Sequence, residues 1–166
     1  MSLVLGIDPG SRVTGYGLVD ARSKKPVYVA SGCIKLKDAS MPERMVVVHQ
    51  SLNQIIEQYR PDTVAIERVF VGKSAGSALK LGHARGVAML AAALAGLSVS
   101  EYAPRTIKQA VAGSGAADKL QVQDMIMRLL GLNAAPAEDA ADALAVALCH
   151  VYSARLNNQV RKAVRS

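Results

Sequence analysis

Tryptophan is absent from this chain of 166 residues, phenylalanine occurs once and cysteine twice. Cys33 and Cys149 lie far apart and belong to no Cys-x-x-Cys or Cys/His pattern, which argues against a zinc site and a disulfide framework and fits a reducing cytoplasm. No secretory segment begins the sequence, and its longest apolar stretch, residues 87–97, is too short to span a bilayer. We expect a soluble, cytoplasmic protein with no membrane contact.

Acidic residues are scarce as well. Asp and Glu number 13 against 20 Lys and Arg, which gives a formal net charge of +7. Several of these acids belong to the cluster described below, so the remaining surface is more basic than the total suggests. Such a surface favours a polyanionic partner, and nucleic acid ranks above an anionic membrane because no strongly amphipathic basic helix stands out.

The pattern of apolar residues predicts one α/β domain over residues 1–156. Three short β-rich segments separated by turn residues indicate an antiparallel meander, and the later strands alternate with helices. Strands are expected at 3–8, 13–20, 27–36, 63–67 and 97–102, and helices at 42–59, 77–94, 104–112, 118–130 and 136–155. The result is a mixed five-stranded sheet, three antiparallel strands and then parallel ones, flanked by helices.

The last ten residues differ from the rest of the chain. Residues 157–166 lose the apolar period and carry three basic side chains. We predict a mobile, disordered basic tail there.

Asp8 and Glu67 end two apolar runs that are expected to be buried strands. Because side chains alternate along a strand, Asp8 shares a face with Val4 and Gly6, and Glu67 shares one with Ala65. The carboxyl ends of parallel strands form the ligand-binding edge of such a sheet, so two neighbouring strands would bring the carboxylates together. Buried carboxylates need a cationic partner, and a hard divalent metal suits them.

Asp139 and Asp142 are spaced i to i+3 in an alanine-rich helix and so project from one face. Alanines around them leave that helix thin enough to approach the sheet. Each acid also has a simpler reading: Asp8 precedes Pro-Gly and could form a turn, and acids in the first turns after Pro136 are usual partners of the helix dipole, an account that is adequate for Glu138. The four acids together favour a metal cluster.

Four short runs add a family context. Residues 6–11 (Gly-Ile-Asp-Pro-Gly-Ser), 65–67 (Ala-Ile-Glu), 77–82 (Ser-Ala-Leu-Lys-Leu-Gly) and 139–144 (Asp-Ala-Ala-Asp-Ala-Leu) resemble the RuvC family of bacterial Holliday-junction resolvases in order and spacing. The resemblance covers residues 1–155. It implies a ribonuclease H-like fold, a homodimer, and catalytic, metal-binding acids at Asp8, Glu67, Asp139 and Asp142.

The chemistry that this resemblance implies is hydrolysis of a phosphodiester assisted by two Mg²⁺ ions per active site, for which Mn²⁺ could substitute. Paired nicks in four-way junction DNA would leave 5′-phosphate and 3′-hydroxyl ends that a ligase can seal. The implied setting is recombination and repair at the nucleoid, with the branch-migration proteins RuvA and RuvB as partners.

Basic residues lie between the acids along the chain. Lys108 and Lys119 match basic positions of the family pattern, and Lys119 follows a glycine-rich stretch at an expected helix start, where it could grip a phosphate and act in catalysis. Lys73, Lys80 and Arg105 are further candidates for DNA binding. Ordinary solvated surface charges are the alternative for all of these residues, because phosphate contacts need no special spacing.

Phe70, the single phenylalanine, follows the catalytic strand where a loop should begin. A core position is the commoner outcome for an aromatic residue. Its position and the family resemblance favour instead a wedge that stacks on an unpaired base at the junction centre.

The helix expected at 77–94 is apolar almost all round, which one sheet face cannot satisfy. Gly82 and Gly86 form a small-residue ridge that, with Leu79, would suit close contact with a second copy of the chain. Burial within the monomer is the alternative.

Other functions compete with junction cleavage. A related ribonuclease H-like nuclease could act on RNA–DNA hybrids. The residues Gly-Ile-Asp-Pro-Gly at 6–10 also resemble the phosphate loop of actin-like sugar kinases, but those enzymes have a duplicated second half that this chain lacks. A non-catalytic junction-binding protein is a further possibility, although four acids would repel phosphate unless metal is present.

Overall fold

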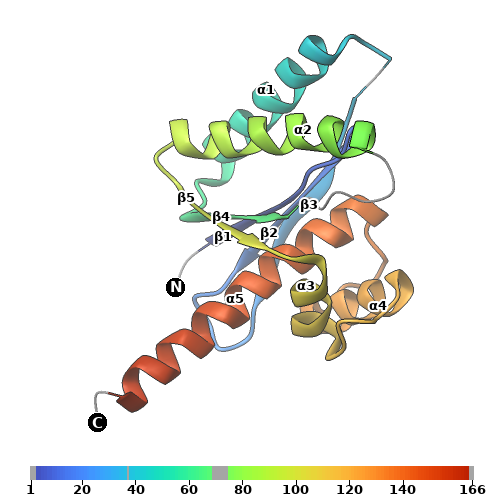
Figure 1. The fold of residues 1–166 in the computed structure, drawn as a ribbon. Helices are drawn as coiled ribbons and strands as arrows, with labels where there is room; N and C mark the ends of the chain where they lie inside the picture. Colours follow the sequence, from blue (N-terminus) through green and yellow to red (C-terminus); the bar gives the residue numbers. More distant parts are fainter. Residues whose placement is uncertain (1–2, 37, 69–74, 165–166) are drawn as a thin grey trace.

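The computed structural model describes residues 3–36, 38–68 and 75–164 (Figure 1). Its elements are β1 (Leu3–Asp8), β2 (Val13–Asp20), β3 (Val27–Lys35), α1 (Met41–Tyr59), β4 (Thr63–Glu67), α2 (Ala75–Leu94), β5 (Ser98–Tyr102), α3 (Pro104–Ala112), α4 (Lys119–Leu130) and α5 (Glu138–Val164). The sheet has the order β3-β2-β1-β4-β5. β1, β2 and β3 pair antiparallel, whereas β1, β4 and β5 run parallel. The predicted mixed five-stranded sheet is confirmed.

Helices cover both faces of this sheet. Helices α1 and α2 lie over one face, and α5 crosses the other with α3 and α4 beside it (Figure 1). The alternation predicted for β1 separates two cores: Leu5 and Ile7 pack with α1 and α2, whereas Val4 packs with α5. Asp8 and Glu67 lie on the same face as Val4 and Ala65, respectively. The alternation along each strand therefore directs both carboxylates to the α5 side of the sheet.

The approach of α5 to the sheet depends on glycines in β1 and β2. A Cβ atom at Gly6 would collide with the carbonyl oxygen of Ala143, and one at Gly15 with the carbonyl oxygen of Asp139. Gly15 lies directly opposite Asp8 in the strand register. The α5 backbone is therefore in direct contact with the backbone of the sheet, next to Asp8.

Helix α4 begins at a complete capping box. The Asp118 side chain accepts a hydrogen bond from the backbone N–H of Gln121 at 2.8 Å, and the Gln121 side chain accepts one from the backbone N–H of Asp118 at 2.9 Å. Such a cap stabilises a helix start by about 1 kcal/mol. It fixes Lys119 in the first turn, where the sequence placed it.

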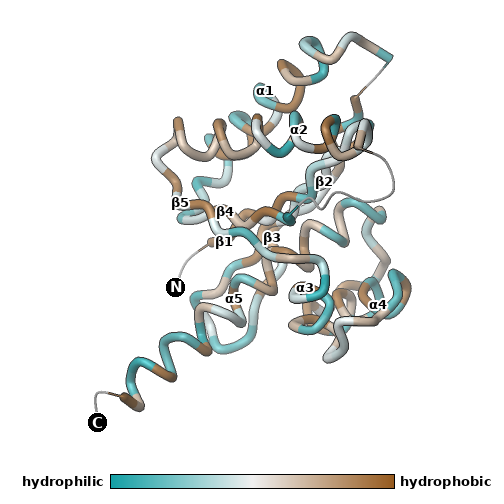
Figure 2. The backbone as a smooth tube through the Cα atoms, viewed as in Figure 1, coloured by the Kyte–Doolittle hydropathy of each residue, from teal (hydrophilic) through white to brown (hydrophobic). Residues whose placement is uncertain are grey.

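The segment for which the sequence predicts a basic tail is helical as far as the structure describes it. Residues 157–164 form the last turns of α5 rather than an irregular segment. Figure 2 shows why the apolar period ends there: α5 changes from apolar to mainly polar where it extends beyond the sheet. Within the described residues no helix is long and apolar enough to cross a membrane.

We expect Gly15→Ala to destabilise the fold, because the added methyl group would push α5 away from β2. Overpacking of this kind costs about 1–3 kcal/mol. Thermal unfolding should show a lower Tm. A Tm equal to that of the wild-type protein would contradict the close approach of α5.

Candidate active site

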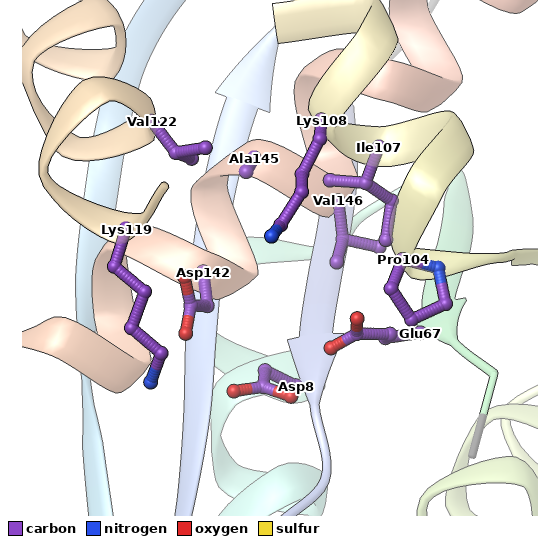
Figure 3. Close-up of a pocket in the computed structure, with 10 residues that line it drawn as sticks. All are labelled: Asp8, Glu67, Pro104, Ile107, Lys108, Lys119, Val122, Asp142, Ala145 and Val146. Atoms are coloured by element: carbon purple, nitrogen blue, oxygen red, sulfur yellow. The ribbon is translucent and has the colours of Figure 1, made fainter. Parts of the chain in front are cut away.

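Parallel pairing of β1 and β4 brings Asp8 and Glu67 together at the carboxyl edge of the sheet. Ile7 lies opposite Ile66 in the register, so the acids that follow are neighbours. A hydrogen bond joins the two carboxyl groups. Asp142 approaches the pair from α5 (Figure 3). The strand and helix patterns of the sequence therefore predicted this convergence correctly.

A cavity of about 290 Å³ opens over these three acids. Lys108 from α3 and Lys119 from α4 extend their ammonium groups into it (Figure 3). Its remaining wall is formed by apolar side chains and a proline, namely Pro104, Ile107, Val122, Ala145 and Val146. Carboxylates and ammonium groups thus line the same cavity, one wall of which is apolar.

A second cavity, of about 330 Å³, adjoins the same carboxyl pair. It is lined by Asp8 and Glu67 again, together with Asp139, Arg68 and Leu81, and by the backbone turn at residues 9–10. Asp8 and Glu67 therefore line both cavities, of which the first also contains Asp142 and the second Asp139.

Burial is the main electrostatic influence on the acids. Burial, together with the charge of Glu67, their hydrogen bond and the charges of Asp142 and Asp139, raises the pKa of Asp8 to about 8. Burial also raises the pKa of Glu67, although the hydrogen bond from Asp8 opposes this rise. The pKa of Asp142 is raised by burial too, against the attraction of Lys119. The protein alone supplies too little positive charge for these carboxylates.

The donor set fits a hard divalent cation, since all its ligands are carboxylate oxygens. Among the residues that the structure describes, however, no three His, Cys, Asp or Glu side chains are placed closely enough to ligate one ion together. A bound cation would offset the negative charge of these acids.

Lys119 has a partner that sequence reasoning missed. Its ammonium forms an ion pair with Glu138, and this hydrogen bond is the main cause of the raised pKa of Lys119. Glu138 was predicted only as a partner of the helix dipole. No local pattern could reveal the pair, because it joins the starts of two different helices, α4 and α5.

Two other predicted DNA contacts, Lys80 and Arg105, lie outside the two cavities. Lys80 is exposed on α2, and Arg105 is exposed on α3, where its side chain lies across Gly115. Phe70 and Lys73 fall outside the residues that the structure describes. Conversely, Arg68 lines the second cavity and was not predicted; its place directly after Glu67 was the available signal.

The predicted interface ridge is exposed on α2. No atom of the described residues lies within 4 Å of a Cβ atom built at Gly82 or Gly86, and the residue Leu79 is 68% exposed. The helix uses its other side, with Ala84, Ala88, Ala91 and Ala92, to pack against the protein. Burial within the monomer therefore does not explain this ridge.

The raised pKa of Asp8 predicts how stability depends on pH without metal. Below about pH 4 the group is protonated in both states and carries no penalty; the penalty grows as the pH rises towards 8 and is constant above it. Relative to wild type, Asp8→Asn should therefore gain stability across this window, by up to a few kcal/mol at 1.36 kcal/mol per pKa unit. Tm measured against pH in chelator would test this. Parallel curves would contradict it, and Mg²⁺ should raise the wild-type Tm at pH 8.

Comparison with known proteins agrees with this geometry. The family described as "Crossover junction endodeoxyribonuclease RuvC" matches residues 4–150. The enzyme of that name from Teredinibacter turnerae is 57% identical, over 92% of this chain and 89% of its own length. The one from Psychromonas ingrahamii is 50% identical, over 99% of this chain and 98% of its own length.

A solved structure extends the agreement to three dimensions. Thermus thermophilus RuvC in complex with its Holliday junction substrate superposes with a TM-score of 0.89 at 36% identity, over 95% of this chain and 97% of that one. The predicted ribonuclease H-like fold is confirmed. Both the sequence match over most of the chain and the shared architecture show that the chain belongs to the RuvC family of crossover junction endodeoxyribonucleases.

Proposed function

We propose that this protein resolves Holliday junctions by metal-dependent, paired and symmetric nicking, in homologous recombination and DNA repair. One observation carries the proposal: two carboxylates at the ends of parallel strands, joined by a third from α5, face two lysines within a single cavity. Membership of a family of junction endonucleases supports junction DNA as the substrate.

Asp8, Glu67, Asp139 and Asp142 would hold the cations. Asp8 and Glu67 line both cavities, so they could contribute to two ions, with Asp142 on one side and Asp139 on the other. Two Mg²⁺ ions, or Mn²⁺ in their place, would supply activation of water and stabilisation of the oxyanion leaving group.

Lys119 and Lys108 would act on the phosphate by charge. The raised pKa of Lys119 keeps its ammonium protonated, so it stabilises negative charge rather than removing a proton. A phosphate entering the cavity would replace Glu138 as the partner of Lys119. The apolar wall near Ile107 and Val122 limits water around these charges, which strengthens each interaction.

A homodimer would supply the second active site that paired cleavage needs. We place its interface on α2, at Leu79, Gly82 and Gly86, because the apolar ridge is exposed and small side chains allow close helix contact. Two equivalent sites related by a twofold axis would nick opposing strands symmetrically. The products would carry ligatable 5′-phosphate and 3′-hydroxyl ends.

The wider DNA surface would include Lys80 and Arg105, which are exposed and free to meet phosphates. Phe70 and Lys73 complete the proposed surface, with Phe70 as the base-stacking wedge. In the cell the enzyme would work in the cytoplasm at the nucleoid, on junctions presented by RuvA and RuvB. A purely structural junction-binding role is disfavoured, because the carboxylates would weaken binding without contributing anything.

The central test uses a labelled synthetic four-way junction with and without Mg²⁺. We expect paired nicks only with metal, and Asp8→Asn, Glu67→Gln, Asp139→Asn and Asp142→Asn should each abolish them while junction binding persists. Metal ligation contributes several kcal/mol to the transition state, whereas affinity rests mainly on basic residues. Near-normal nicking by two of these variants would refute the assignment. Equal cleavage of an RNA–DNA hybrid would indicate a different nuclease.

Single-turnover cleavage tests the lysines. Lys119→Ala and Lys108→Ala should each slow cleavage at saturating protein by about 10²-fold, the cost typical of losing one charge-stabilising group. Lys24→Ala removes a lysine beyond the opposite edge of the sheet and is the control. A lysine that only contacts the DNA backbone would instead weaken binding and lower its salt dependence, leaving the saturated rate unchanged.

A further inference from the structure

The second cavity has no role in the reaction beyond its acids, yet its other lining residues suit a nucleic-acid strand. Arg68 stands at its rim, and Leu81 from α2 faces the turn at residues 9–10 within it. A guanidinium recognises a phosphate, and an apolar side chain suits the face of a deoxyribose. A recess for a cation alone would need neither residue.

Arg68 is held in place without being neutralised. Its Nε lies 3.5 Å from an Oε of Glu101, with 55% of the Arg68 side chain exposed. Glu101 has a second, closer partner in Arg85, whose side chain is only 28% exposed. One carboxylate thus serves two guanidinium groups, and one positive charge of this trio remains uncompensated.

Glu101 is firmly placed because it belongs to the sheet. It lies on β5 opposite Ile66 of β4, and its ion pair with Arg85 connects the strand to α2. The backbone N–H of Arg68 donates a hydrogen bond to the carbonyl oxygen of Tyr102 at 2.8 Å. The base of Arg68 is therefore fixed beside the metal-binding edge, while its solvent-exposed end can turn to a ligand.

The two cavities share Asp8 and Glu67, and their other lining residues differ. A DNA strand whose scissile phosphate lies in the first cavity, against Lys108 and Lys119, would bring an adjacent phosphate near Arg68 where it continues past the shared carboxyl pair. We infer that Arg68 and Leu81 form a subsite for the phosphodiester next to the scissile one, on the side away from the two lysines. This inference rests on the proposed junction cleavage.

Junctions with one neutral methylphosphonate test the subsite. The substitution is made in turn at the phosphate on each side of the scissile one, and KM and kcat are measured for wild type and Arg68→Ala. In wild type, one of the two positions should raise KM by about tenfold, the effect of losing a charge-assisted contact. In Arg68→Ala the unmodified junction should already show that rise, and the same methylphosphonate should add nothing.

Two further variants serve as controls for the effect of charge and for the position of the arginine. Arg68→Lys keeps the charge and should restore most of the affinity. Arg22→Ala removes an arginine near the opposite edge of the sheet, where Asp20 pairs with Leu3, and should behave as wild type at both positions. Equal methylphosphonate effects in wild type and Arg68→Ala would overturn the subsite. A uniform loss in Arg68→Ala that ignores phosphate position would also overturn it, since it would indicate a structural role.

The outcomes for the two proposals are separable. Failure of the wild-type protein to nick an unmodified junction would refute the proposed function. Normal nicking with no position-specific effect of Arg68 would leave that function intact and refute only the subsite.

Discussion

The direct contact of the α5 backbone with the glycines of β1 and β2 is the constraint on which the site depends. A side chain at Gly6 or Gly15 would hold the helix away from the sheet. Asp142 could then no longer reach the pair formed by Asp8 and Glu67. The same contact covers this pair and removes its carboxylates from bulk water, so one packing feature both assembles the acids and raises their pKa values.

The buried acids lower the stability of the metal-free fold, although metal binding would depend on them. Burial of like charges destabilises the metal-free fold at neutral pH, because the native state favours the protonated form of Asp8 more than the unfolded chain does. A divalent cation would reverse the penalty and turn the repulsion into binding energy. Metal affinity and fold stability are therefore linked through the acids that would carry the chemistry: a neutral site would be more stable without metal, but it would lose its affinity for the cation.

The sequence predicted those parts of the molecule that depend on local periodicity. Alternation along β1 predicted which face of the sheet carries Asp8. The three-residue spacing of Asp139 and Asp142 predicted that both lie on one side of α5. Features that need the register of distant segments could not be predicted in this way. One such feature is the contact of Gly15 in β2 with the backbone of Asp139 in α5. Another is the ion pair of Arg68 with Glu101, which forms because β4 and β5 are neighbouring strands. The helix at residues 157–164 could not be predicted for a different reason: loss of the apolar period indicates loss of burial, and a helix can continue into solvent without that period.

Acidic partners of the basic residues around the two cavities complete the charge arrangement. Glu138 pairs with Lys119, and Glu101 pairs with Arg68. Without such partners these cations would be drawn to the buried carboxylates that line the two cavities. Exposed ion pairs contribute only about 0–1 kcal/mol, so a phosphate can replace a carboxylate at little cost. The acids would thus keep the cations beside the metal-binding edge but available, and the arrival of the DNA strand would release them for the phosphates.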